Sequence, residues 1–191
     1  MNDFALWFET GVLHIADLKA YDHILFVSLI AFSYPISDWK KTALLVTGFT
    51  IGHSVSLALS VFHIVHLPSY YTEIWIAITI LSTAAFHILH FKDQKPRHEK
   101  YLWMIIPFFG GIHGLGFSSL LRSMLGETED KCLPLLCFNL GLEAGQLFIL
   151  TTVLLFSLLL TRIFHYPFRN VKLFISCIIA ITSVYLIWQR L

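Results

Sequence analysis

Long runs of apolar residues, separated by short polar stretches, are the main feature of this sequence. A helix needs about 20 mainly apolar residues to cross the hydrocarbon core of a bilayer. Five runs meet this length, at residues 42–65, 70–91, 101–121, 133–161 and 171–188. A sixth run, at 21–39, is shorter and contains Pro35, so its second half is expected to be irregular. The pattern predicts an all-α bundle of about six transmembrane helices in a single integral membrane domain, residues 1–191.

The segment before these runs, at 4–18, is too short and too polar to cross a bilayer. It is predicted to lie at the membrane interface or to re-enter the membrane, folding over the first crossing helix. Trp7 is expected to anchor it, because tryptophan is enriched at membrane–water interfaces.

Lysine and arginine are concentrated in alternate loops. The loops after the first, third and fifth predicted crossings hold nine of the 13 basic residues: Lys40, Lys41, Lys92, Lys95, Arg97, Lys100, Arg162, Arg169 and Lys172. Because cytoplasmic loops carry the excess of positive charge, these loops are predicted to lie inside. Both termini are then outside, as in a multi-pass protein of the inner (plasma) membrane.

The composition agrees with this class of protein. Hydrophobic residues make up 57% of the chain and charged residues only 13%, with a mean hydropathy of +0.73, whereas soluble domains carry about 25% charged residues. The net charge is +1 and no basic tract is present, which argues against nucleic acid as a partner. The lipid bilayer is the expected environment, and the oligomeric state stays open.

Several ionisable residues lie inside or beside the predicted crossings, where a charged group is costly and usually functional. The candidates are His14, Asp17, Asp22, His23, His53, His113 and Glu143. Imidazoles and carboxylates are ligands of first-row divalent metals, so these residues predict a metal site that four helices form together.

Each candidate also has a structural interpretation. Glu143 could pair with His53 or His113 as a neutral, hydrogen-bonded core network, and with Asn139 and Gln146 it forms one polar stripe on a helix. His14 and Asp17 could bind a metal together or form the solvated face of an interfacial helix.

Two glycine-rich stretches fall within predicted crossings, "GFTIGHS" at 48–54 and "FFGGIHGLGF" at 108–117. Glycine permits either a close contact between helices or a local break in a helix. The sequence leaves both possibilities open.

Four ordered motifs, "HIADLKAYDHILFV", "GFTIGHSVSLALS", "GGIHGLGFSSLL" and "FNLGLEAGQL", resemble the HupE/UreJ family of small bacterial membrane proteins. The resemblance implies a nickel or cobalt permease of about six helices. It also implies that His14, Asp22 and His23 correspond to the family's N-terminal His…Asp-His motif, and His113 to the histidine of its glycine-rich motif.

Two departures from that pattern indicate a divergent branch of the family. Seven residues separate His14 from Asp22, where the better-studied nickel branch has five. That branch also carries a second histidine and a glutamate in the glycine-rich motif, where this chain has Phe109 and Gly116. Glu143 could supply the missing carboxylate.

The leading functional hypothesis is a permease for a divalent transition-metal ion (Ni, Co or Zn), which Asp22 and His23 capture and which then passes to His53, His113 and Glu143. Since neutral imidazoles bind the metal, uptake should fail as the pH falls below the histidine pKa. The alternative is an intramembrane zinc-dependent hydrolase acting on a lipid or a peptide, with the same residues holding the zinc. A purely structural zinc is a third possibility.

Overall fold

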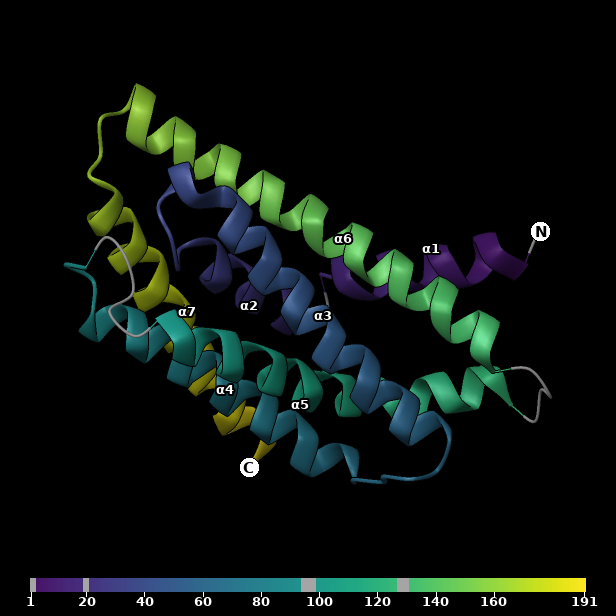
Figure 1. The fold of residues 1–191 in the computed structure, drawn as a ribbon. Helices are drawn as coiled ribbons and strands as arrows, with labels where there is room; N and C mark the ends of the chain where they lie inside the picture. The colour runs from purple at the N-terminus through teal and green to yellow at the C-terminus, as the bar shows by residue number, and fades with distance from the viewer. Residues whose placement is uncertain (1–2, 19–20, 94–98, 127–130) are drawn as a thin grey trace.

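The computed structural model describes residues 3–18, 21–93, 99–126 and 131–191. Within these residues the chain is helical, with no strand. The helices are α1 (Asp3–Ala16), α2 (Asp22–Ala31), α3 (Trp39–Val61), α4 (Ser69–Leu89), α5 (Glu99–Leu125), α6 (Cys132–Leu158) and α7 (Phe168–Arg190), with a 3-10 turn at Ile36–Asp38 and a π-helical turn at Leu159–Ile163 (Figure 1). The predicted all-α membrane bundle is confirmed.

Among the described residues, five helices are long and apolar enough to cross a membrane, namely α3 to α7 with the short turns that extend α3 and α6. The segment at 21–39 differs from the predicted crossing. Its helix, α2, ends at Ala31 after 10 residues, which cover only about 15 Å at 1.5 Å per residue. The chain then passes through Pro35, which is extended, into the 3-10 turn, so the irregular second half is confirmed.

The N-terminal segment forms α1, but it does not fold over α2 as expected. It lies along α6 instead, where Gly11 faces the backbone of Phe138 and Gly141 faces the backbone of Phe8 so closely that neither position has room for a Cβ atom. Trp7 is partly buried and packs against the core.

In Figure 1, α1 runs inward from the end of the bundle where the N-terminus lies, and α2 continues toward the opposite end. In place of the expected first crossing the chain thus has two short helices, which are separated between residues 16 and 22.

The two glycine-rich stretches bring α3 and α5 into close contact. A Cβ atom at Gly52 would collide with the carbonyl of Pro107, and one at Gly114 would collide with the carbonyl of His53. Both helices run without interruption through these positions. Of the two possibilities that the sequence left open, close helix contact is the one observed.

The basic residues gather at the end where α3, α5 and α7 begin and where α4 and α6 finish (Figure 1). Lys95 and Arg97, two of the nine basic residues of these loops, lie outside the described residues, as does Lys19. At the opposite end Arg190, in the last turn of α7, contacts Glu73 near the start of α4. This distribution keeps the charge bias from which the positive-inside rule predicts that both termini lie outside.

Candidate metal centre

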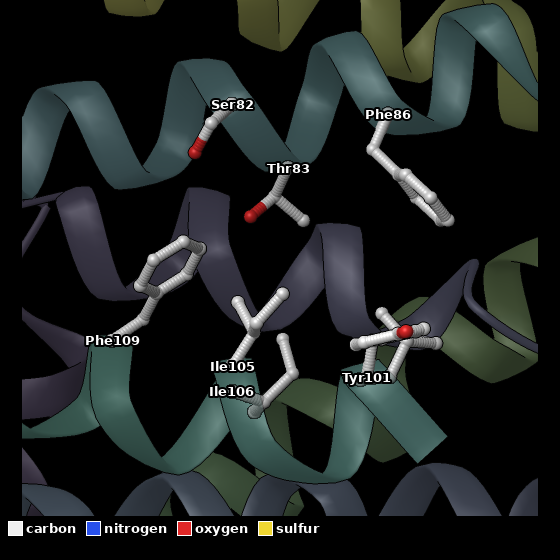
Figure 2. A pocket seen from close by; sticks show the side chains of 8 residues that line it. Ser82, Thr83, Phe86, Tyr101, Ile105, Ile106 and Phe109 are labelled. Atoms are coloured by element: carbon white, nitrogen blue, oxygen red, sulfur yellow. The ribbon is translucent and has the colours of Figure 1, made fainter. Parts of the chain in front are cut away.

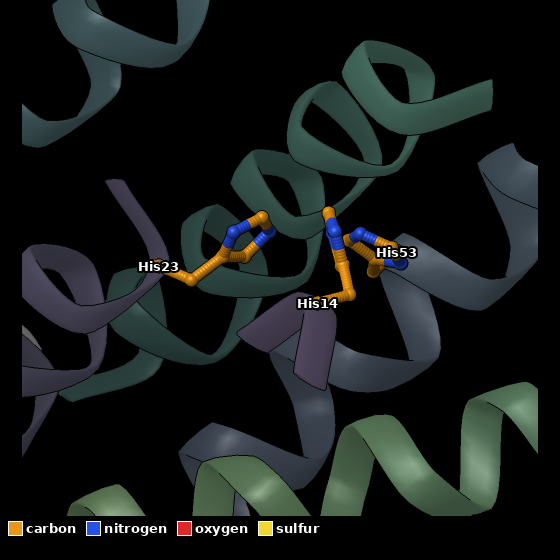
Figure 3. A group of neighbouring side chains, drawn as sticks. All are labelled: His14, His23 and His53. Atoms are coloured by element: carbon orange, nitrogen blue, oxygen red, sulfur yellow. The ribbon is translucent and has the colours of Figure 1, made fainter. Parts of the chain in front are cut away.

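Three histidines from three different helices meet where the first crossing is broken. His14 lies in the last turn of α1, His23 in the first turn of α2, and His53 in the middle of α3. Each offers a ring nitrogen within 4.8 Å of those of the other two. Figure 3 shows the three rings gathered between the ribbons of their helices. The break between α1 and α2 thus positions two of the three imidazoles.

The ring nitrogens of these histidines lack protein partners. Five of the six, namely Nε2 of His14 and both nitrogens of His23 and of His53, are buried with no hydrogen-bond partner among the described residues. His53 is completely buried and His23 is 5% exposed. A buried polar group without a partner costs about 1–3 kcal/mol, so a packing role alone does not account for this cluster.

The spacing suits a metal ion. Imidazole nitrogens bind zinc at about 2.0–2.1 Å, which places two such nitrogens about 3.4 Å apart around a tetrahedral ion. The three imidazoles each offer a nitrogen within 4.8 Å of the others, a separation somewhat larger than this value. Imidazole is a ligand for zinc, copper, iron and nickel.

A fourth histidine, His113 of α5, lies beside the cluster, with its ring centroid 5.3 Å from that of His23. Its Nε2 is 3.1 Å from the hydroxyl oxygen of Thr79, and that hydroxyl already donates its hydrogen to the carbonyl of Ile76. Nε2 of His113 therefore donates to Thr79, which leaves Nδ1 as the nitrogen with a lone pair. This Nδ1 is also buried and has no partner among the described residues.

Aromatic rings surround the histidines. The ring of Phe117 lies 3.7 Å from that of His14, centroid to centroid, and the rings of Phe26 and Phe49 each lie 5.0 Å from His113. These side chains keep the local dielectric constant low, so charges act on one another more strongly here than in water.

A cavity of about 240 Å³ leads to the histidines, and His14, His23 and His113 line it together with charged residues. The charged residues are Asp22, Glu73 and Arg190. The Arg190 guanidinium lies 3.2 Å from the Asp22 carboxylate and 3.5 Å from that of Glu73, and it donates to the Glu73 carbonyl. Two carboxylates against one guanidinium give this outer mouth a net negative charge.

Comparison with known proteins agrees with the motifs. The family model for the HupE / UreJ protein matches residues 1–190. The chain belongs to the HupE/UreJ family. Searches of curated proteins and of solved structures found no match.

Two of the predicted site residues neither join the group of three histidines nor line the cavity. Asp17 is exposed beyond the end of α1 at Ala16, so it does not share a helical face with His14. Glu143 lies between α6 and α3, where it accepts hydrogen bonds from Thr47 and Thr50. The structure therefore brings together His14, Asp22, His23, His53 and His113, and it places Asp17 and Glu143 elsewhere.

Three residues of the site were not foreseen from the sequence, namely Glu73, Thr79 and Arg190. The sequence could have indicated Glu73 and Arg190, because opposite charges at the same end of two predicted crossings can form an ion pair. Thr79 gave none, since a threonine on an apolar helix usually bonds to its own backbone.

A wider groove of about 340 Å³ between α4 and α5 is different in character. Figure 2 shows apolar side chains such as Phe86, Ile105 and Phe109 along it. The hydroxyls of Ser82 and Thr83 donate to the Thr79 carbonyl of their own helix. None of its lining residues is a histidine, cysteine or carboxylate, so it is not a metal site.

Proposed function

We propose that this protein is a permease of the inner (plasma) membrane whose substrate is a divalent transition-metal ion of the nickel and cobalt type. The HupE/UreJ family is associated with nickel and cobalt transport. The observation that carries the proposal is the group of partnerless imidazole nitrogens inside a membrane bundle, at the break of a crossing helix.

The ion first meets the outer mouth, where the carboxylates of Asp22 and Glu73 attract it. His14, His23 and His113 line the same cavity and exchange for its hydration water. His53 is completely buried behind them and is the innermost ligand of the cluster. Neutral imidazoles bind the metal, and the nearby carboxylates offset part of its charge.

Thr79 has a positioning role in this scheme. By accepting from Nε2 of His113 it fixes the ring orientation and the tautomer that directs Nδ1 to the ion.

Uptake of nickel, cobalt and zinc ions into proteoliposomes tests the proposal. Replacing His53 or His23 by alanine is expected to lower metal affinity and uptake by at least about tenfold, because losing an outer-shell partner alone costs 10- to 100-fold. His66→Ala is the matched control, since His66 is exposed in an outer loop against Arg122. Melting curves in detergent verify that each variant folds.

Equal uptake by the wild type and both site variants would contradict the proposal. Tightly bound zinc without any flux would instead support a hydrolase, which a lipid or peptide cleavage assay would then detect.

A further inference from the structure

A second polar group lies between α3 and α6, along a groove of about 290 Å³. We call it the α3–α6 polar group; it consists of Thr47, Thr50 and Ser54 from α3 and Asn139, Glu143 and Gln146 from α6. Apolar side chains flank the groove, with Ile51 59% exposed and Leu140 49% exposed. In a membrane these exposed faces meet lipid, so the polar group must be satisfied without bulk water.

Acceptors outnumber hydrogens around Thr50. Its hydroxyl oxygen lies 3.1 Å from the carbonyl oxygen of Val46 and 2.7 Å from Oε1 of Gln146, and it also contacts the Glu143 carboxylate. A threonine hydroxyl has one hydrogen to donate, so it cannot satisfy three acceptors. Ser54 repeats the pattern, with one hydroxyl between the Thr50 carbonyl and Oδ1 of Asn139.

Exchanging the two ends of the Gln146 amide does not remove the imbalance. The side chain is completely buried, and its Nε2 has no hydrogen-bond partner among the described residues. Turning the amide over would give Thr50 a donor, but the single Thr50 hydrogen would still face two acceptors, the Val46 carbonyl and the Glu143 carboxylate. The group therefore keeps an excess of oxygen lone pairs, which a bound cation would use.

The charge of the group selects the kind of cation. Among the residues that the structure describes, no ion pair involves Glu143. One carboxylate neutralises a single positive charge, whereas a divalent ion would leave a net charge facing lipid at high cost. Carboxylate, hydroxyl and carbonyl oxygens are ligands of hard cations, unlike the imidazole nitrogens of the histidine cluster.

We propose that the α3–α6 polar group is a binding site for a monovalent hard cation, sodium, with Glu143 and Thr50 as its central ligands. The site is distinct from the metal centre and does not depend on the proposed function. Helix α3 connects the two, because Thr50 and His53 are one turn apart.

Protection of Glu143 from a hydrophobic carbodiimide tests this proposal in the full-length protein. The reagent reaches carboxyl groups from the lipid phase and modifies their protonated form, so a cation bound to the carboxylate slows the reaction. Modification of Glu143 is followed by peptide mass spectrometry in sodium chloride and in choline chloride, at equal pH and ionic strength. At sodium concentrations near ten times Kd the reaction is expected to slow about tenfold, since protection follows 1 + [L]/Kd.

Two threonine variants separate the site from general salt effects. Thr50→Val removes the central hydroxyl and is expected to abolish protection. Thr152→Val is the matched control and should keep it, because Thr152 is an exposed residue of α6 that bonds only to the Phe148 carbonyl of its own helix.

Melting temperatures measured in the same two salts give a second readout, with sodium expected to stabilise the wild type and the Thr152→Val variant but not the Thr50→Val variant. The proposal is overturned if the rate of Glu143 modification and the melting temperature of the wild type are the same in sodium and choline. A carboxyl group that binds only protons would give that result. Full sodium protection of the Thr50→Val variant would overturn it as well.

Discussion

At the scale of single residues, Arg190 occupies the position that an entering cation needs. Its guanidinium lies between the Asp22 and Glu73 carboxylates at the mouth of the cavity that leads to the histidines. The side chain of Arg190 is only 19% exposed and that of Asp22 only 13%, so solvent screens this pair less than a surface pair. In the proposed permease, a metal ion would compete with Arg190 for the same two carboxylates.

Arg190→Gln is expected to raise the apparent affinity for a divalent metal by up to about tenfold, or 1.4 kcal/mol. The change removes the competing positive charge and makes the mouth more negative. Titration calorimetry of the purified protein with nickel checks this, with Arg122→Gln as the control on the same outer end, since Arg122 contacts Ser60 and His66 instead. Unchanged or weaker binding in the Arg190→Gln variant alone would show that Arg190 does not compete.

At the scale of helices, the glycines of α3 and α5 set the distance between His53 and His113. The Gly114 Cα faces the carbonyl of His53 and the hydroxyl of Ser56, so this contact lies directly at the metal centre. Any side chain at that position pushes the two helices apart and moves both imidazoles.

Gly114→Ala is expected to destabilise the protein by about 1–3 kcal/mol, the usual cost of overpacking, and to weaken metal binding. Gly111→Ala is the matched control from the same motif. A Cβ atom there would meet its nearest neighbour, the Gly52 carbonyl oxygen, at an ordinary 3.8 Å. Melting temperature and metal affinity in detergent are the measurements, and equal values for both variants would rule out the role assigned to this contact.

The break between α1 and α2 is the element that the sequence did not predict. Hydropathy locates runs of apolar residues, so it predicted one crossing at 21–39 and an interfacial or re-entrant segment at 4–18, where the structure has the two short helices α1 and α2. The polar stretch between the two helices favoured a surface position for the N-terminal segment. Nothing in a single sequence shows that Gly11 and Gly141 hold α1 against α6. The tertiary contact decides the path of the chain.

At the scale of the whole molecule, the sequence predicted the fold class well and the composition of the site only partly. Length and charge bias are enough to predict an all-α bundle with both termini on one side. The depth of His53, His113 and Glu143 also follows from counting residues along each crossing. The rotation of each helix about its axis cannot be predicted in this way, because lipid and core both accept apolar side chains in a membrane. For this reason the sequence could not show that Glu143 turns toward Thr47 and Thr50, away from the histidines.

The central claim is that imidazoles from α1, α2 and α3 hold one divalent ion inside the bundle. X-ray absorption at the nickel edge, on the full-length protein loaded with one equivalent of nickel, tests it most directly. We predict scattering from two or three imidazole rings, with one ring fewer in the His53→Ala variant and no change in the His66→Ala variant. A spectrum with oxygen ligands alone, identical in all three proteins, would contradict the account.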